Sequence, residues 1–187
     1  KNSSENAFVD PKDNLGLSEV AKWFIQGQLA HGRAMMALLN PTPNCYHRVK
    51  PQTFAPSNVS WGVEDRTAMI RVKSRRDNRT HVENRLASAM ANPYLSAAAT
   101  LAAGLPGIEA KLELQPESTG LAEEDASLPK VPQSLEEALD ALTEDAAFRE
   151  MLGEEFFEVF NAVKRFELAR FHSHVTDWER NEYLDVY

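Results

Sequence analysis

Apolar residues in the N-terminal half recur at helical spacing and predict two helices. The first runs from Ser18, a residue type that caps helices, to about Leu39. The second begins at Asn92, which is followed by proline, a favoured residue in the first turn. It is rich in alanine and leucine, and Gly104 and Gly107 are expected to help end it.

The C-terminal half predicts further helices. Ser134 and Glu137 form a capping box for a helix that reaches about Leu142. Helical spacing continues over Phe148–Phe171, and the apolar side chains expected to face inward there are Phe156, Phe157, Val159, Phe160, Val163 and Phe166. Another capping box, Thr176–Glu179, predicts a last helix that runs to the terminus.

Between these helical regions, three stretches have the β-branched and apolar composition of strands. They are Ser57–Val63, Thr67–Lys73 and Thr80–Leu86. The first two are separated only by Glu64–Arg66, which is the spacing of a β-hairpin, although no glycine turn is present.

The third stretch carries charge on one face. Period-two alternation places His81, Glu83 and Arg85 on the same side of the strand. Such groups are costly to bury without partners, so they should face water or a polar cavity. An exposed face with surface ion pairs is one interpretation. A carboxylate between cations also suits a divalent metal, and the arginine fork suits carboxylate or phosphate.

Length and charge narrow the class of protein. The chain has 187 residues and 43% hydrophobic content, which suits one domain of roughly 100–200 residues. Residues 1–108 hold 13 Lys and Arg against 8 Asp and Glu, a net charge of +5. Residues 109–187 hold 7 against 20, a net of −13. Overall acidity argues against nucleic acid as a main partner, because phosphate backbones need a basic face.

The setting expected from the sequence is cytoplasmic. Cys45 is the only cysteine, so an internal disulfide is impossible, which fits a reducing compartment. No apolar run reaches the roughly 18 residues of a membrane span. The start, KNSSENAF, has neither a signal peptide nor an initiator methionine, so the chain is expected to begin mid-protein.

Several motifs together resemble the glutamine synthetase family, specifically the C-terminal half of its catalytic domain. The match covers nearly the whole chain and is carried by Asn40-Pro41-Thr42, Asn44–Arg48, Ala55-Pro56, Trp61–Arg66, Ile70–Val72, Val82–Arg85, Ala91–Leu95, Ala102–Ile108 and Val175–Glu179. The resemblance implies an α+β fold, with antiparallel strands of a half-barrel covered by helices. It also implies that residues 1–187 are the C-terminal portion of one catalytic domain, without the N-terminal β-grasp domain or the first part of the catalytic domain.

The resemblance assigns roles to individual residues. Glu83 corresponds to a ligand of the Mg²⁺ or Mn²⁺ that bridges the nucleotide phosphates. Arg85 corresponds to the arginine that meets the substrate carboxyl and the transferring phosphate, and Arg48 to the glutamate-binding arginine. Arg66 is implied to be catalytic with Arg85, and Arg66 and Arg71 to contact phosphate and nucleotide. The stretch from residue 40 to 94 would thus be half of a site for nucleoside triphosphate and an amino-acid carboxylate.

Three positions depart from the family pattern. Phe54 stands where ammonia-using members carry a glutamate that deprotonates ammonium, and phenylalanine has no proton chemistry. His81 replaces an arginine that contacts ATP, and its charge depends on pH. Leu112 occupies the position of the tyrosine adenylylated in regulated bacterial enzymes, so that control is not expected.

The resemblance therefore favours an ATP-dependent ligase of nitrogen metabolism that joins glutamate to an amine through γ-glutamyl phosphate. A true glutamine synthetase using ammonia and a non-catalytic, ring-forming structural relative are the alternatives. The expected partners are glutamate, ATP, ammonia or a small amine, and further subunits in a homo-oligomer of stacked rings, with no nucleic acid and no membrane. One metal carboxylate is too few for a site, so residues 1–187 alone are expected to be inactive.

Overall fold

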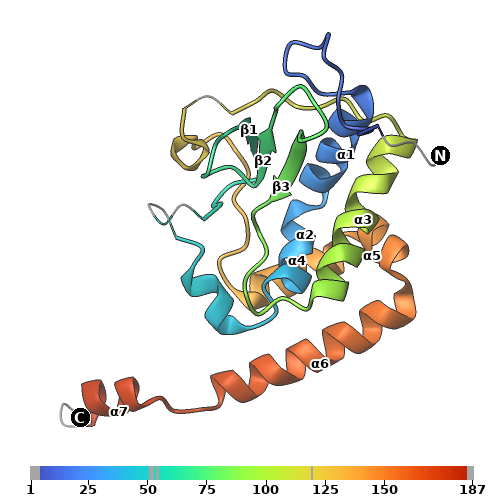
Figure 1. Cartoon of the computed structure of the whole chain (residues 1–187). Coiled ribbons are helices and arrows are strands. Elements are labelled where there is room, and N and C mark those ends of the chain that lie inside the picture. The colour runs from blue at the N-terminus through green and yellow to red at the C-terminus, as the bar shows by residue number, and fades with distance from the viewer. Residues whose placement is uncertain (1–4, 51–52, 54, 119, 185–187) are drawn as a thin grey trace.

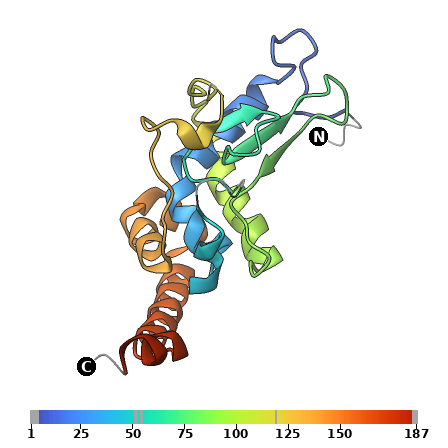
Figure 2. The same ribbon diagram turned by 90° about the vertical axis from the view of Figure 1, so that its left-hand side faces the viewer.

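The computed structural model describes residues 5–50, 53, 55–118 and 120–184. A small sheet lies beside a group of helices, and a long C-terminal helix runs along one end of that group before a last short helix (Figures 1 and 2). This arrangement confirms the α+β class. In chain order the elements are α1 (Glu19–Ala30), α2 (Gly32–Leu39), the 3₁₀ helix η1 (Pro43–His47), β1 (Trp61–Val63), β2 (Ile70–Lys73), β3 (His81–Asn84), α3 (Pro93–Glu109), the 3₁₀ helix η2 (Ala122–Glu124), α4 (Leu135–Glu144), α5 (Ala146–Leu152), α6 (Glu154–His172) and α7 (Asp177–Tyr183).

The sheet has the order β1-β2-β3 and only part of the expected pairing. β2 and β3 are antiparallel, with Ile70 opposite Asn84 and Lys73 opposite His81. β1 and β2 run parallel, with Trp61 beside Ile70. The prediction of a hairpin between the first two strands is therefore wrong, and antiparallel pairing holds for β2 and β3 alone among the described strands.

The connection between β1 and β2 explains the parallel pairing. Glu64 takes a left-handed conformation, with φ of 55°, and its amide donates to the carbonyl of Val72 at 3.0 Å. The Asp65 carboxylate then accepts from the amide and the hydroxyl of Thr67, at 2.7 Å each. This compact turn carries the chain back to the start of β1, where the amide of Ile70 donates to the carbonyl of Ser60 at 3.0 Å.

The free edge of β1 is covered by residues 115–118. The amide of Ser118 donates to the carbonyl of Trp61 at 3.0 Å, and the Trp61 indole donates to the carbonyl of Gln115 at 2.8 Å. The amide of Val63 donates to the Glu117 carboxylate at 2.6 Å. Because these bonds occupy the backbone groups of the edge, β1 is shielded from pairing with another strand.

The single helix expected from residue 18 to 39 is broken. Ser18 caps α1 as predicted, and its hydroxyl accepts from the amide of Ala21 at 3.2 Å. His31, with φ of −105° and ψ of 9°, leaves the helical conformation, and α2 begins at Gly32. A Cβ at Gly32 would lie 2.6 Å from the Met69 sulfur, so the glycine allows α2 to pack closely beside the residue before β2.

The glycines of α3 have a different role from the one predicted. Asn92 caps the helix as expected, accepting from the amides of Tyr94 and Leu95. The helix then continues through Gly104 and Gly107 to Glu109, so the expectation that these glycines help end it is wrong. They lie instead where α3 crosses α1: a Cβ at Gly107 would meet the backbone of α1, and a Cβ at Gly104 would meet the ring of Phe24.

The C-terminal helices confirm the predicted caps but not the predicted burial. The Ser134 hydroxyl caps α4, and both hydrogen bonds of the Thr176 capping box are present at α7. Gly153, with φ of 90°, separates α5 from α6, so the continuous helix expected from residue 148 to 171 is wrong. Phe157 and Phe160 are buried, whereas three of the side chains expected to face inward are exposed, namely Val159, Val163 and Phe166. Within the described residues, no helix has the length and apolar character needed to cross a membrane.

A histidine–aspartate contact joins the two helix breaks. His31 Nδ1 lies 2.7 Å from an Asp145 carboxylate oxygen, and its ring stacks on Phe148. The other oxygen of Asp145 accepts from the amide of Phe148 at 3.0 Å and caps α5. Burial alone would raise the pKa of Asp145, but the hydrogen bonds from His31 and Phe148 outweigh burial and lower it.

Because the folded-state pKa is lowered, the ionised Asp145 stabilises the fold above its ordinary pKa near about 4, and this stability is lost as the pH falls through the lowered value. We expect Asp145→Asn, which preserves the cap, to lower the free energy of unfolding by about 1–2 kcal/mol at neutral pH. Urea denaturation at several pH values checks this. The exposed Asp140→Asn is the control, and an Asp145→Asn deficit that persists undiminished in acid would contradict the prediction.

Candidate active site

The register of β2 and β3 brings a carboxylate between two arginines. Arg71 on β2 lies directly opposite Glu83 on β3. One Glu83 oxygen lies 2.9 Å from Nη1 of Arg85, and the other lies 3.4 Å from Nη1 of Arg71. The two arginine side chains are only 16% and 12% exposed, whereas Glu83 is 38% exposed. The carboxylate therefore keeps access to solvent while both cations are held in the fold.

A second glutamate extends this cluster from the turn after β1. Glu64 contacts Nη2 of Arg71 through one oxygen and lies 3.2 Å from Nη2 of Arg75 through the other. The hydrogen bond from Arg71 holds the pKa of Glu64 below its ordinary value. The sequence analysis treated Glu64 only as part of a turn. No local pattern places it beside Arg71, because the contact follows from the parallel pairing of β1 and β2.

The other predicted arginines meet at the end of β3. Nε of Arg85 donates to the carbonyl of Arg66 at 3.0 Å, while the Arg66 residue itself is exposed. Arg48, which follows η1, donates to the carbonyls of Arg85 at 2.8 Å and Leu86 at 3.1 Å. Burial lowers the pKa of the Arg48 guanidinium, and the nearby charge of Arg85 lowers it further. A cationic group with several donors thus surrounds the end of β3.

His81 and Phe54 stand apart from this cluster in different ways. His81 opens β3 opposite Lys73 and is exposed, with Nδ1 2.7 Å from the carbonyl of Arg79. It lies on the predicted face, but no hydrogen bond or ion pair between described residues joins its side chain to Glu83, Arg71 or Arg85. Phe54 lies outside the described residues.

Glu83 is a suitable metal ligand, but too few other ligands lie beside it among the described residues for a complete metal site. Mg²⁺ and Mn²⁺ prefer oxygen ligands, and a partly exposed carboxylate fits that preference. In the part of the chain that the structure describes, no three His, Cys, Asp or Glu side chains gather in one place. Glu83 can therefore supply one ligand to a divalent cation, and the other ligands would have to come from outside this cluster.

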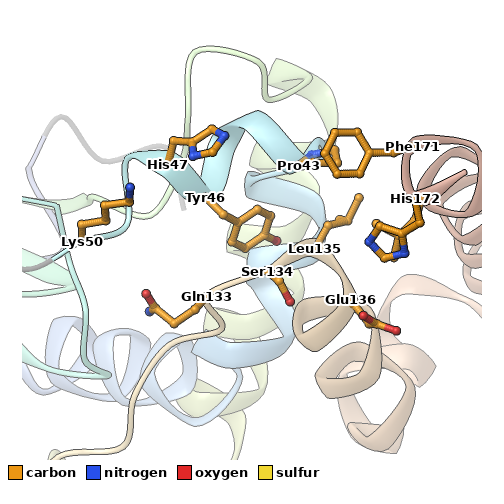
Figure 3. A pocket seen from close by; sticks show the side chains of 11 residues that line it. Pro43, Tyr46, His47, Lys50, Gln133, Ser134, Leu135, Glu136, Phe171 and His172 are labelled. Carbon is orange, nitrogen blue, oxygen red and sulfur yellow. The ribbon is translucent and has the colours of Figure 1, made fainter. Parts of the chain in front are cut away.

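A cavity of about 270 Å³ lies away from the charged cluster, between η1, the start of α4 and the end of α6. Figure 3 shows Tyr46 near its middle, with Leu135 and Phe171 beyond it. Tyr46 is 6% exposed, and burial raises the pKa of its phenol. None of the predicted site residues lines this cavity. The cavity is therefore separate from the predicted site.

Comparison with known proteins identifies the family to which this chain belongs. The family model described as "Glutamine synthetase, catalytic domain" matches residues 1–183. The chain belongs to the glutamine synthetase catalytic-domain family. This membership confirms the resemblance carried by the motifs around Arg48, Arg66 and Glu83.

Individual members of the glutamine synthetase family are similar to this chain over nearly all of its length. The glutamine synthetase of Thermotoga maritima is 38% identical over 187 residues, covering 96% of this chain and 43% of the relative. That of Thermus thermophilus is 38% identical over 190 residues, covering 98% of this chain and 43% of the relative. The chain therefore spans less than half the length of these curated relatives.

Solved structures extend the agreement to three dimensions. A structure of GmaS in its apo form superposes with a TM-score of 0.84 at 34% identity, covering 97% of this chain and 42% of that chain. GmaS in complex with ADP gives a TM-score of 0.83 at 33% identity, covering 97% and 43%. The glutamine synthetase-type fold is thus shared over nearly all of these 187 residues.

Proposed function

We propose that the intact protein is an ATP-dependent carboxylate–amine ligase that forms a γ-glutamyl amide from glutamate and an amine. The observation that carries this proposal is the position of Glu83 between Arg71 and Arg85, on a sheet face of the glutamine synthetase type. Phosphoryl transfer depends mainly on positioning and on neutralising charge, and this face gathers the groups for both.

Each residue has a role in this proposal. Arg85 and Arg66 neutralise the charge of the transferring phosphoryl group, and Arg85 also meets the γ-carboxylate. Arg48, held by two carbonyls at the end of β3, binds glutamate with a guanidinium whose position is fixed. Fixed donors aimed at developing charge need no reorganisation during the reaction. Arg48 and Arg85 therefore bring the carboxylate and the phosphoryl group together.

Nucleotide binding would involve Arg66, Arg71 and His81. The solved complex of GmaS with ADP supports a nucleotide site in a chain of this fold. Glu83 would hold a Mg²⁺ or Mn²⁺ ion, and such an ion, when bound, draws charge away from the phosphate oxygens. His81 lies at the exposed start of the same strand, where its ring can stack on or donate to a nucleotide.

The amine is the finer part of the proposal. Phe54 supplies no base at the position where ammonia-using members carry glutamate, which favours an amine that needs no deprotonation by that side chain. A true glutamine synthetase, whose base comes from another group, is the second candidate, supported by the curated relatives. The retained Glu83, Arg71 and Arg85 cluster argues against a purely structural relative, which has no physical need for it.

The C-terminal helices support a homo-oligomer. α7 lies beyond the far end of α6, away from the sheet (Figure 1), and the segment formed by α6 and α7 exposes apolar side chains that a second copy would cover. Those at least 48% exposed are Val159, Val163, Phe166, Phe171, Val175, Trp178, Tyr183 and Leu184. An assembly of stacked rings, as the family resemblance implies, would bury them.

The 187 residues by themselves should be inactive. Within the described residues, no three His, Cys, Asp or Glu side chains gather to form a metal site around Glu83. ATP, Mg²⁺ and glutamate added to this chain should therefore give no amide. Turnover by the isolated chain would contradict this.

Phosphate release by the intact protein tests the function. We expect release that requires ATP, Mg²⁺, glutamate and one of a panel of small amines, with ammonia run in parallel. Release with an amine and not with ammonia would support the amine ligase, and release with ammonia would favour the second candidate. No release with any amine, together with no ATP binding, would overturn both and leave a structural relative.

A further inference from the structure

Glu64 has an unusual backbone and an unusual pair of partners. Its φ of 55° is a left-handed conformation, which costs an L-residue with a Cβ about 1 kcal/mol or more. Its carboxylate nevertheless reaches both Arg71 and Arg75. Strained residues persist where the surroundings determine their conformation, and they concentrate at functional sites.

Among the charged residues of this cluster, Arg71 is the one whose position depends most on Glu64. Its Nε is buried and has no hydrogen-bond partner among the described residues, so its terminal nitrogens set its position. Nη2 contacts Glu64, whereas Nη1 lies 3.4 Å from Glu83, a long and weak contact. The two glutamates thus share one arginine unequally, and Glu64 has the closer contact.

The unequal sharing has a consequence for Glu83. One Glu83 oxygen bonds to Arg85 at 2.9 Å, and the other, Oε2, has among the described residues only the long contact with Arg71. Oε2 therefore has the weaker cationic contact and keeps more capacity to bind another cation. If Arg71 were free of Glu64, both its terminal nitrogens could turn to Glu83 and occupy Oε2 in the bidentate geometry that arginine favours.

We propose that Glu64 is a positioning residue that holds Arg71 away from Glu83 and so keeps Oε2 of Glu83 open to the divalent cation of the bound nucleotide. Arg75 supports it by binding the second Glu64 oxygen at 3.2 Å. This inference rests on the proposed function, since it assumes that Glu83 is a metal ligand.

The test measures Mn²⁺ binding to the intact protein with ADP, by electron paramagnetic resonance, in the absence of turnover. Glu64→Asn tolerates the left-handed backbone and removes the charge, and Glu64→Gln keeps the length of the side chain. We expect both to weaken Mn²⁺ binding by about tenfold, the effect of losing a group that orients a metal ligand. Glu154→Gln removes a similar contact with Arg149 at the start of α6 and should leave Mn²⁺ binding unchanged.

A double substitution separates positioning from a general structural effect. If Glu64 acts through Arg71, adding Glu64→Asn to an Arg71→Gln variant should change Mn²⁺ affinity no further. Full additivity, or Mn²⁺ affinity equal to that of the unsubstituted protein in both Glu64 variants, would overturn the proposal. Failure of the unsubstituted protein to bind Mn²⁺ with ADP would instead overturn the metal role of Glu83 on which it rests.

Discussion

Arg85→Ala should reduce kcat of the intact protein by about 10²–10³-fold, the usual effect of removing a fixed donor for transition-state charge. Arg85 bonds to Glu83 through Nη1 and to the carbonyl of Arg66 through Nε. Its loss removes a cation from the proposed phosphoryl site and releases Glu83 from its closest partner. Because both effects act on the reacting groups, kcat should fall more than the affinity for ATP.

Phosphate release under saturating ATP and glutamate measures this effect. Arg85→Lys should recover little, because an ammonium group cannot reproduce the two directions of the guanidinium fork. Arg79→Lys is a matched control, since Arg79 is 79% exposed and pairs with Asp77 on the preceding connector. Activity of Arg85→Ala equal to that of the control would remove Arg85 from the catalytic group.

Gly107→Ala should destabilise the protein by about 2–3 kcal/mol, a cost typical of overpacking a close contact. A Cβ at this position would lie 2.3 Å from the carbonyl oxygen of Trp23 and 2.8 Å from the Cα of Gly27. Both atoms belong to the backbone of α1, so no side chain can turn aside. The two helices would have to move apart.

Urea denaturation of the intact protein, followed by tryptophan fluorescence, measures this loss. Glu109→Ala is the control, because Glu109 is exposed on the last turn of the same helix and should change stability by less than about 0.5 kcal/mol. Equal midpoints for Gly107→Ala and Glu109→Ala would contradict the close approach of α1 and α3.

The parts of the fold that could be predicted are those set by neighbouring residues. Ser18, Asn92, Ser134 and Thr176 each cap a helix through a side-chain bond to an amide within three positions, so their sequence context is sufficient. The break at His31 depends on contacts with Asp145, which lies far along the chain. Helical periodicity continues across such a break and cannot reveal it.

The role of a glycine likewise depends on contacts with residues that are distant in the sequence. The sequence analysis expected Gly107 to help end a helix because glycine is common after helix ends. Its neighbours in space are Trp23 and Gly27, which belong to another helix. A glycine that permits helix–helix contact and one that helps end a helix look alike until the partner is known.

The candidate site shows the same limit. Alternation along one strand correctly grouped Glu83 and Arg85, because side chains two residues apart share a face. The role of Glu64 and Arg75 in the ion-pair cluster was missed, since it depends on β1 lying parallel to β2. No further ligand beside Glu83 could be predicted, and no three His, Cys, Asp or Glu side chains gather among the described residues.

Transfer of ¹⁸O from glutamate to phosphate would test the proposed chemistry most directly. In the proposed reaction a γ-carboxylate oxygen attacks the γ-phosphorus of ATP and ADP leaves. The amine then attacks the γ-carbon, and the bond from that carbon to the transferred oxygen breaks. With γ-carboxylate-labelled glutamate, the intact protein should release phosphate carrying one ¹⁸O atom. Amide formation with unlabelled phosphate would contradict a γ-glutamyl phosphate and, with it, the role proposed for Arg85 and Glu83.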